Sequence, residues 1–248
     1  MTFQDHFSNH SPAYSQYRPR YPDALFIYLA SLCGDQQQAW DCATGNGQAA
    51  LSLTQCFRRV VATDASEAQI QQAAPHPRVT YRVSPAANSG LGDRSCDLIT
   101  VAQALHWFDR TKFYLEANRV LKANGILAVW CYQLIRTSPE LDALVYHYYD
   151  AVLGEYWPPE RRLIEAYYQT IDFPFEEIET PNFTMTTQWS LDHLLGYLNT
   201  WSATQRYIAQ QGQNPLESMH TAFAEAWGKP DTRSICWPLH LRVGKVHH

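Results

Sequence analysis

The stretch "AWDCATGNGQAALSL" (residues 39–53) decides the fold. An apolar start leads through Asp41 to Gly45 and Gly47, and small residues then continue as a helix. Glycine takes positive φ angles readily and lets the backbone come close to a ligand. The pattern therefore predicts a strand, a tight turn and a helix around a binding site. Several nucleotide and adenosyl cofactors are bound at such turns, so the turn alone leaves the ligand open.

Strand-like and helix-like segments alternate from this stretch onward. The expected strands are 38–43, 59–64, 78–83, 96–102, 125–132, 175–187 and 234–244. The expected helices are 23–33, 47–57, 66–74, 110–122, most of 138–170, 190–211 and 215–227. Near-continuous apolar strands between helices are typical of a parallel sheet covered on both faces. We therefore expect an α/β, Rossmann-like, mostly parallel seven-stranded sheet with helices on both faces and a helical cap.

The chain shows no repeat or linker that would divide it into independent domains. We expect an N-terminal cap segment in 1–35 and a cofactor-binding core in 36–132. Residues 133–248 are expected to supply a helical cap insertion and the last strands of the sheet.

Composition narrows the function class. The 248 residues carry a net charge of −5, which argues against general nucleic-acid binding. The six cysteines show no C-x-x-C spacing and the ten histidines show no H-E-x-x-H spacing, so a metal site is not predicted. No stretch has the features of a signal peptide or the length of a membrane span. We expect a cytoplasmic protein with no membrane partner.

Two acidic residues bear on the ligand. Asp64 ends the second expected strand, where a carboxylate can accept both hydroxyls of a ribose. Together with G45-x-G47-x-x-A50 it also satisfies a dinucleotide fingerprint. Asp41 would repel a pyrophosphate but would attract the ammonium of an amino-acid moiety. The alternatives are a nicotinamide-dependent oxidoreductase, an enzyme that uses an adenosyl amino acid, and a non-catalytic protein that binds one.

Further stretches carry a family resemblance over nearly the whole chain. They include "YSQYRPRYP" (14–22), "WDCATGNGQ" (40–48), "SCDLITVAQALHWFD" (95–109) and "EANRVLKANGILAV" (116–129). With them the chain resembles the class I S-adenosylmethionine-dependent methyltransferases, in the methyltransferase type 11 branch that includes trans-aconitate methyltransferases. The resemblance implies S-adenosylmethionine as cofactor. It also implies direct displacement, without metal, onto the carboxylate or hydroxyl of a small-molecule acceptor.

The same resemblance implies a set of site residues. The implied cofactor-binding residues are Tyr17, Arg18, Asp41, Ala43, Gly45, Gly47, Asp64, Ala65, Ala86, Ala87, Asn88, Gln103 and Ala104. Among them, Asp41, Gly45 and Gly47 would surround the methionine moiety, Asp64 the ribose, and residues 86–88 the adenine. Ala43 stands where the family usually has glycine, and an alanine tolerates a tight turn there if its φ stays negative. Relatives often carry Asp-Ala-Glu where this chain has Pro85-Ala86-Ala87.

The sequence gives fewer signals for the residues that bind the methyl acceptor. His106 is the candidate catalytic base or hydrogen-bond partner, because a histidine titrates near neutral pH. The alternative is a histidine that only packs at the head of the next helix. Trp107, Tyr132 and Trp201 are candidate substrate contacts, and Arg18, Arg20 and Arg206 would suit an anionic substrate. We expect a monomer or a homodimer.

Overall fold

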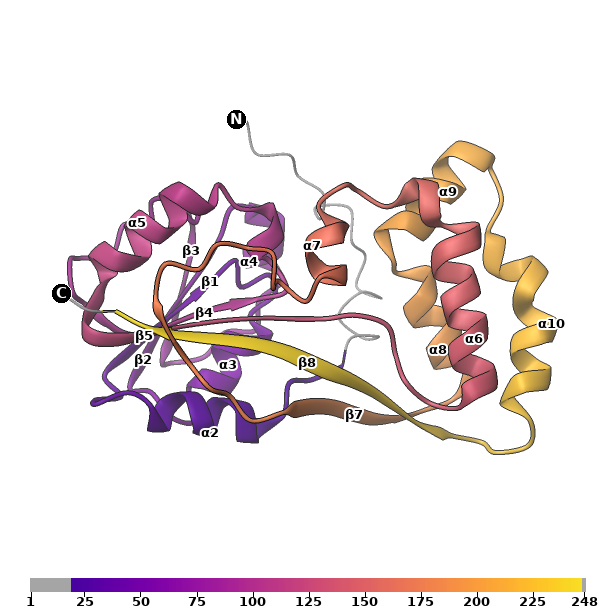
Figure 1. Ribbon diagram of the computed structural model, residues 1–248, viewed down its shortest axis with the longest axis horizontal. Coiled ribbons are helices and arrows are strands. Elements are labelled where there is room, and N and C mark those ends of the chain that lie inside the picture. The colour runs from indigo at the N-terminus through magenta and orange to yellow at the C-terminus, as the bar shows by residue number, and fades with distance from the viewer. Residues whose placement is uncertain (1–18, 247–248) are drawn as a thin grey trace.

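The computed structural model describes residues 19–246, which fold around one eight-stranded sheet (Figure 1). The strand order is β3-β2-β1-β4-β5-β8-β6, and β7 also pairs with β8. Strands β1 to β5 are parallel, and β8 runs antiparallel to its neighbours. The strands are β1 (Gln38–Cys42), β2 (Arg59–Asp64), β3 (Val79–Val83), β4 (Cys96–Ala102), β5 (Leu121–Tyr132), β6 (Glu176–Ile178), β7 (Phe183–Trp189) and β8 (Arg233–Lys245). The predicted Rossmann-like fold, with its mostly parallel sheet, is confirmed.

The expected number of seven strands is wrong by one. The segment 175–187, taken from the sequence as one strand, forms β6 and β7, which pair with different parts of β8. Pro181 lies between them and has no N–H to donate to a ladder, so the pairing stops there.

Strand β8 joins the parallel sheet to the remainder of the molecule. Its second half, from Leu239 to Lys245, pairs with β5. Its first half, from Arg233 to Leu239, pairs with β7. Figure 1 shows this long strand running from the parallel strands toward the helical group at the other end of the molecule. The cap is thus attached to the sheet by continuous strand pairing as well as by loops.

The helices fall into two groups. Those packed along the parallel strands are α2 (Asp23–Ser31), α3 (Gln48–Leu53), α4 (Glu67–Gln71) and α5 (Arg110–Val120). Those of the cap region are α6 (Pro139–His147), α7 (Arg161–Glu165), α8 (Leu191–Asn199), α9 (Ser202–Gln211) and α10 (Pro215–Trp227). The helical run after residue 138 is interrupted at Trp157–Pro159. The division of the chain near residues 35 and 132 remains a prediction.

Both faces of the sheet are covered, because neighbouring residues of a strand point to opposite sides. Ala39 and Leu98 belong to the apolar cluster that includes α2 and α3, and this cluster continues into the cap. Trp40 and Ile99 belong to a second cluster that includes Phe113 of α5. All four strand residues are 0% exposed. The carboxyl ends of the parallel strands are therefore held by packing on two sides.

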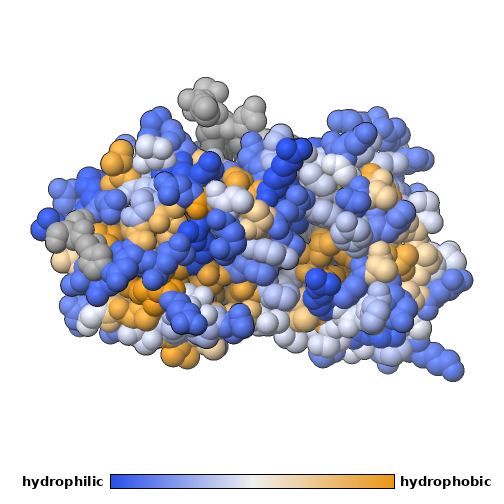
Figure 2. Space-filling model, in the orientation of Figure 1, coloured by the Kyte–Doolittle hydropathy of each residue, from blue (hydrophilic) through white to orange (hydrophobic). Residues whose placement is uncertain are grey.

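The visible face of the molecule is mainly hydrophilic, with apolar side chains exposed in small groups (Figure 2). Large exposed apolar side chains in residues 19–246 come from separate elements: Ile27, Val83, Leu115, Tyr146 and Tyr167. No helix in this part of the chain is long and apolar enough to cross a membrane.

Candidate active site

A cleft of about 2030 Å³ opens at the carboxyl ends of β1, β2, β4 and β5. In an open α/β sheet this is where ligands bind. One side, called here the cofactor wall, consists of residues 43–46, 64–65, 84–87 and 102–104. The opposite side, the cap wall, consists of residues 157–163, Tyr197 and residues 200–202. His106, Trp107 and Tyr132 line the cleft between the two walls.

The turn after β1 forms the base of the cofactor wall. Gly45 and Gly47 adopt positive φ angles of 57° and 88°. A Cβ atom on Gly47 would also overlap the hydroxyl of Tyr81, so both the backbone conformation and the available space favour glycine here. Gly45 lines the cleft, whereas Gly47 lies behind it as the residue before α3.

Ala43 does not meet the condition stated for an alanine in this turn. Its φ angle is +56°, not negative. An L-residue pays about 1–2 kcal/mol for the left-handed region because its Cβ crowds the following carbonyl oxygen. The turn thus keeps the glycine conformation although the glycine is missing, and Ala43 still lines the cleft.

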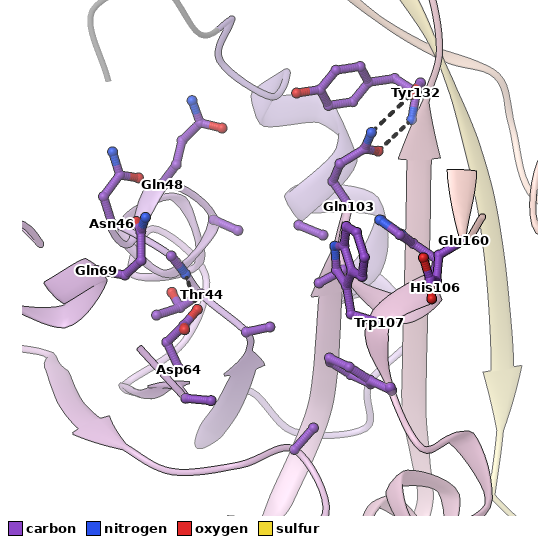
Figure 3. A pocket seen from close by; sticks show the side chains of 18 of the residues that line it. Thr44, Asn46, Gln48, Asp64, Gln69, Gln103, His106, Trp107, Tyr132 and Glu160 are labelled. Atoms are coloured by element: carbon purple, nitrogen blue, oxygen red, sulfur yellow. Dashed lines mark hydrogen bonds between the residues drawn. The ribbon is translucent and has the colours of Figure 1, made fainter. Parts of the chain in front are cut away.

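Asp64 lies at the end of β2 and faces the turn. One carboxylate oxygen accepts the Gly45 N–H at 2.9 Å, and the other accepts the Ser66 N–H at 2.9 Å. Asp64 also lines the cleft, where a carboxylate can accept hydrogen bonds from ligand hydroxyls. Figure 3 shows Asp64 on the same side of the cleft as Asn46 and Gln48, with Trp107 and Glu160 across from them. Ala65 follows on the same wall.

Asp41 lies beneath the turn and does not line the cleft. It is 1% exposed, and its oxygens accept hydrogen bonds from the hydroxyls of Thr44 at 2.5 Å and Thr100 at 2.8 Å. Burial raises the pKa of Asp41 to about 6, against the opposing effect of those hydroxyls. In this structure Asp41 therefore holds the Thr44 turn to the neighbouring strand β4.

The loop after β3 brings Ala86 and Ala87 to the cleft, but not Asn88. The loop is anchored from behind. Glu116 of α5 accepts hydrogen bonds from the backbone N–H and the hydroxyl of Ser89, at 2.8 Å and 2.6 Å. The adenine side predicted from the sequence is therefore a backbone surface held in place by a buried carboxylate.

Gln103 follows β4 at a φ of +55° and lines the cleft with Ala104. Its side-chain amide donates to the Tyr132 carbonyl at 3.1 Å and accepts the Tyr132 N–H at 2.8 Å (Figure 3). Both polar atoms of the amide are therefore engaged in joining the ends of β4 and β5. What Gln103 offers a ligand is mainly its backbone.

His106 lies in a short 3-10 turn, Leu105–Trp107, and is 5% exposed. Its Nδ1 lies 2.8 Å from the hydroxyl of Tyr168. Burial, together with a smaller effect of the positive charge of Arg161, lowers the pKa of His106 to about 3. Of the two roles predicted for His106, hydrogen-bond partner fits a neutral ring, whereas proton acceptor near neutral pH does not.

The cap wall contains groups that the sequence analysis missed. Arg161 lies over the Trp157 ring at 4.7 Å and over the Tyr149 ring at 5.2 Å, and its Nε donates to the Tyr149 hydroxyl at 3.0 Å. Trp157 in turn packs on Trp201, with ring centroids 5.6 Å apart. The signal available was "WPPERRL" (157–163), in which two prolines that interrupt a helix are followed by two arginines.

The arginines proposed from the sequence differ in whether they reach the cleft. Arg20 lines the cleft. Arg206 does not, and donates to the Tyr156 carbonyl at 3.1 Å. Tyr17 and Arg18 lie outside the described residues. Within residues 19–246 no group of three or more histidine, cysteine, aspartate or glutamate side chains is placed to hold a metal ion.

Known proteins match this chain along its whole length. Residues 40–129 match the family described as a methyltransferase domain. A protein of Dictyostelium discoideum, named as a methyltransferase, is 33% identical over 98% of this chain and 95% of its own. A solved structure described as a type II methyltransferase from Anaeromyxobacter dehalogenans is 43% identical. It covers 93% of this chain and 99% of its own, with a TM-score of 0.88. A methyltransferase structure from Bacillus halodurans shares the fold, with 22% identity, coverage of 91% and 99%, and a TM-score of 0.52.

Proposed function

The chain belongs to the class I S-adenosylmethionine-dependent methyltransferases, and from this premise we propose that it methylates a small-molecule acceptor held between the cofactor wall and the cap wall. S-adenosylmethionine is its cofactor. The family assignment decides against the nicotinamide-dependent alternative. The trans-aconitate branch, the cytoplasmic location, the oligomeric state and the absence of a nucleic-acid partner remain predictions.

The cofactor wall fits this cofactor. Asp64 presents carboxylate lone pairs for ribose hydroxyls, and Ala86 and Ala87 offer a small, uncharged surface for adenine. The positive-φ turn at Gly45 exposes backbone for the methionine part. When bound, S-adenosylmethionine supplies a sulfonium methyl group that a nucleophile takes in one displacement, leaving the electron pair of the broken bond on sulfur.

The enzyme's own contribution is to align an acceptor and exclude water. Alignment alone lowers such barriers by roughly 7–11 kcal/mol in well-oriented systems. A carboxylate acceptor arrives with its proton already lost, whereas an alcohol needs a base. Since His106 is neutral and a poor proton acceptor, the site favours the carboxylate over the hydroxyl. The observation that carries the proposal is Arg161, a cation at the cleft placed to pair with an acidic group.

The test is methyl transfer from radiolabelled S-adenosylmethionine to a panel of small acids and alcohols. A carboxylate product is a methyl ester, which releases volatile methanol in mild alkali, whereas a methyl ether keeps its label. We expect label that alkali releases. Transfer only to proteins or nucleic acids, or to no acceptor at all, would overturn the proposal.

Arg161→Gln sharpens the assignment. It should raise the acceptor KM about tenfold, equivalent to about 1.4 kcal/mol, because one charge-assisted hydrogen bond is lost. Arg162→Gln is the matched control, because Arg162 also lines the cleft but is exposed. The affinity for S-adenosylmethionine should stay unchanged in both variants. Equal effects of the two substitutions would mean that only overall charge matters.

A further inference from the structure

The contact between His106 and Tyr168 joins two distant parts of the chain. His106 follows β4, and Tyr168 follows α7, 62 residues later. Tyr168 is 0% exposed, and His106 is 5% exposed. Within residues 19–246 no group is hydrogen-bonded to the second ring nitrogen of His106, Nε2, and this atom is not among the fully buried polar atoms that lack a partner. Because His106 lines the cleft, Nε2 is the ring nitrogen available to a ligand.

The backbone around Tyr168 is strained. Tyr167 and Tyr168 are consecutive residues at φ angles of 55° and 58°. A non-glycine residue in this region costs of order 1–3 kcal/mol and persists only where its surroundings impose it. Here Arg242 imposes it. Its Nη1 donates to the carbonyls of Tyr168 at 2.8 Å and Ile171 at 2.7 Å.

Arg242 is itself fixed. It is 8% exposed, and its guanidinium pairs with Glu177 through Nε at 3.1 Å and Nη2 at 2.5 Å. It also lies over the Phe173 ring at 4.6 Å. A buried cation with this many partners holds the loop rigidly. On the side that faces the cleft, this arrangement places the Tyr168 hydroxyl against Nδ1 of His106.

The direction of the hydrogen bond follows from the chemistry of the two groups. Burial raises the pKa of Tyr168 well above its usual value, and the nearby Cys131 thiol adds to this. A smaller effect of the His106 backbone opposes the shift only in part. The tyrosine therefore keeps its proton. Within residues 19–246, Nδ1 of His106 is the one hydrogen-bond partner of this buried hydroxyl, so the proton points at Nδ1. An imidazole that accepts at Nδ1 carries its proton on Nε2.

Several charged and titratable groups lie around this pair. The positive charge of Arg161, in α7, disfavours a positive charge on the His106 ring. Cys131 of β5 and Tyr21 face Tyr168, and both favour its protonated form. Glu160 lines the same cleft beside Arg161. Figure 3 shows Glu160, His106 and Trp107 grouped on one side of the cleft.

We propose that Tyr168 is a positioning residue that holds His106 as a fixed, neutral hydrogen-bond donor, with Nε2–H directed to an oxygen of the acceptor. The inference rests on the proposed methyl transfer to a small acceptor. His106 gives up no proton and takes none, and the acceptor oxygen's lone pair forms the new bond to carbon. The acceptor's negative charge is neutralised in the transition state. A neutral donor orients it without the strong ground-state binding that an imidazolium would add.

The first experiment needs no acceptor. Long-range ¹H–¹⁵N NMR of the full chain, with the His106 signals assigned by their loss in His106→Gln, reports the tautomer directly. We expect His106 to be neutral with its proton on Nε2 from pH 5 to pH 9. A proton on Nδ1, or a titration midpoint inside this range, would overturn the proposal whether or not an acceptor is known.

Tyr168→Phe removes the proposed positioning group. We expect the pure Nε2–H tautomer to give way to a mixture, while the ring stays neutral. Tyr114→Phe is the matched control, because Tyr114 is another buried tyrosine and donates to the Asp172 carbonyl in the same loop, at 2.9 Å. It should leave the His106 signals unchanged. A tautomer that survives Tyr168→Phe, or that changes equally in both variants, would contradict the positioning role.

Turnover then separates donor from base. His106→Gln keeps an N–H donor but cannot accept a proton as imidazole does, so kcat should fall less than about fivefold. His106→Ala removes the donor, and kcat should fall about a hundredfold, as when one oriented donor is removed from an active site. Equal losses in the two variants would indicate a base, and no loss in either would remove His106 from the reaction.

Discussion

The two walls of the cleft are built by different means. The cofactor wall is made of backbone. Its turns adopt positive φ at Ala43, Gly45 and Gln103, and its side chains mostly hold other backbone groups in place. The cap wall is made of side chains, in which Arg161 lies on the rings of Trp157 and Tyr149. A backbone wall suits a cofactor common to many enzymes, whereas a side-chain wall changes with each substitution and so suits the acceptor.

The largest effect is expected when the loss of a carboxylate from the cofactor wall is compared with the loss of one from the cap wall. Asp64→Ala should weaken S-adenosylmethionine binding about a hundredfold, or about 2.8 kcal/mol, because ribose partners are lost and the Gly45 N–H is left unpaired. Glu160→Ala removes a carboxylate from the cap wall and should change the affinity less than about threefold. Calorimetric titration measures both. Similar losses would mean that the walls do not divide the ligands as proposed.

The contrast also explains what the sequence could predict. The parallel strands and the turn at residues 43–47 were predictable because short apolar runs and glycines are local signals. The break between β6 and β7 is also local, since Pro181 marks it, but it lies inside an alternating pattern that reads as a single strand.

The cap wall was not predictable in the same way. Arg161 reaches the cleft because a chain break at Trp157–Pro159 and packing on Trp201 place α7 there. The Tyr168 contact depends on a buried arginine in β8, 74 residues further along the chain. Such placement is a property of tertiary packing, and no local period in the sequence records it.

Gly47→Ala tests whether the turn depends on backbone conformation. The substituted residue would have to keep a left-handed φ, and its Cβ atom would displace Tyr81. The Tyr81 hydroxyl donates to the Ala74 carbonyl at 3.0 Å. We expect a loss of about 2–3 kcal/mol in the free energy of unfolding by urea. Gly90→Ala is the control, with φ +69° and open space around the added atom, and should lose about 1 kcal/mol. Equal losses would show that Tyr81 moves aside without cost.

The pH dependence of stability contrasts one buried acid with one buried base. The pKa of Asp41 rises from 3.8 to about 6 on folding, so its contribution to stability falls as pH rises between these values. The pKa of His106 falls from 6.5 to about 3, so the unfolded chain binds the extra proton and stability rises with pH across that range. From pH 4 to pH 6 the two contributions oppose each other.

Removing either group should therefore reveal the pH dependence of stability that the other group causes. His106→Gln should make the free energy of unfolding fall by about 1.4 kcal/mol more per pH unit between pH 4 and 6 than it does in the wild type. Asp41→Asn should change the slope by a similar amount in the opposite direction. Urea unfolding at pH 4.5 and 5.5 measures both slopes. Changes of the same sign would contradict the assigned pKa directions.

The smallest effect concerns two alanines of the cofactor wall, for which the same substitution to glycine should change stability in opposite directions. Ala43→Gly relieves a left-handed φ of 56°, a gain of about 1 kcal/mol that exceeds the added freedom of the unfolded chain. The net stabilisation should be about 0.5 kcal/mol. Ala65 is not among the residues with positive φ, so Ala65→Gly gains nothing in the folded state and should lose about 0.5 kcal/mol. The two urea midpoints should therefore move in opposite directions. If both fall, the turn does not hold Ala43 under strain, and the backbone account of the cofactor wall fails at the residue where this chain departs from its family.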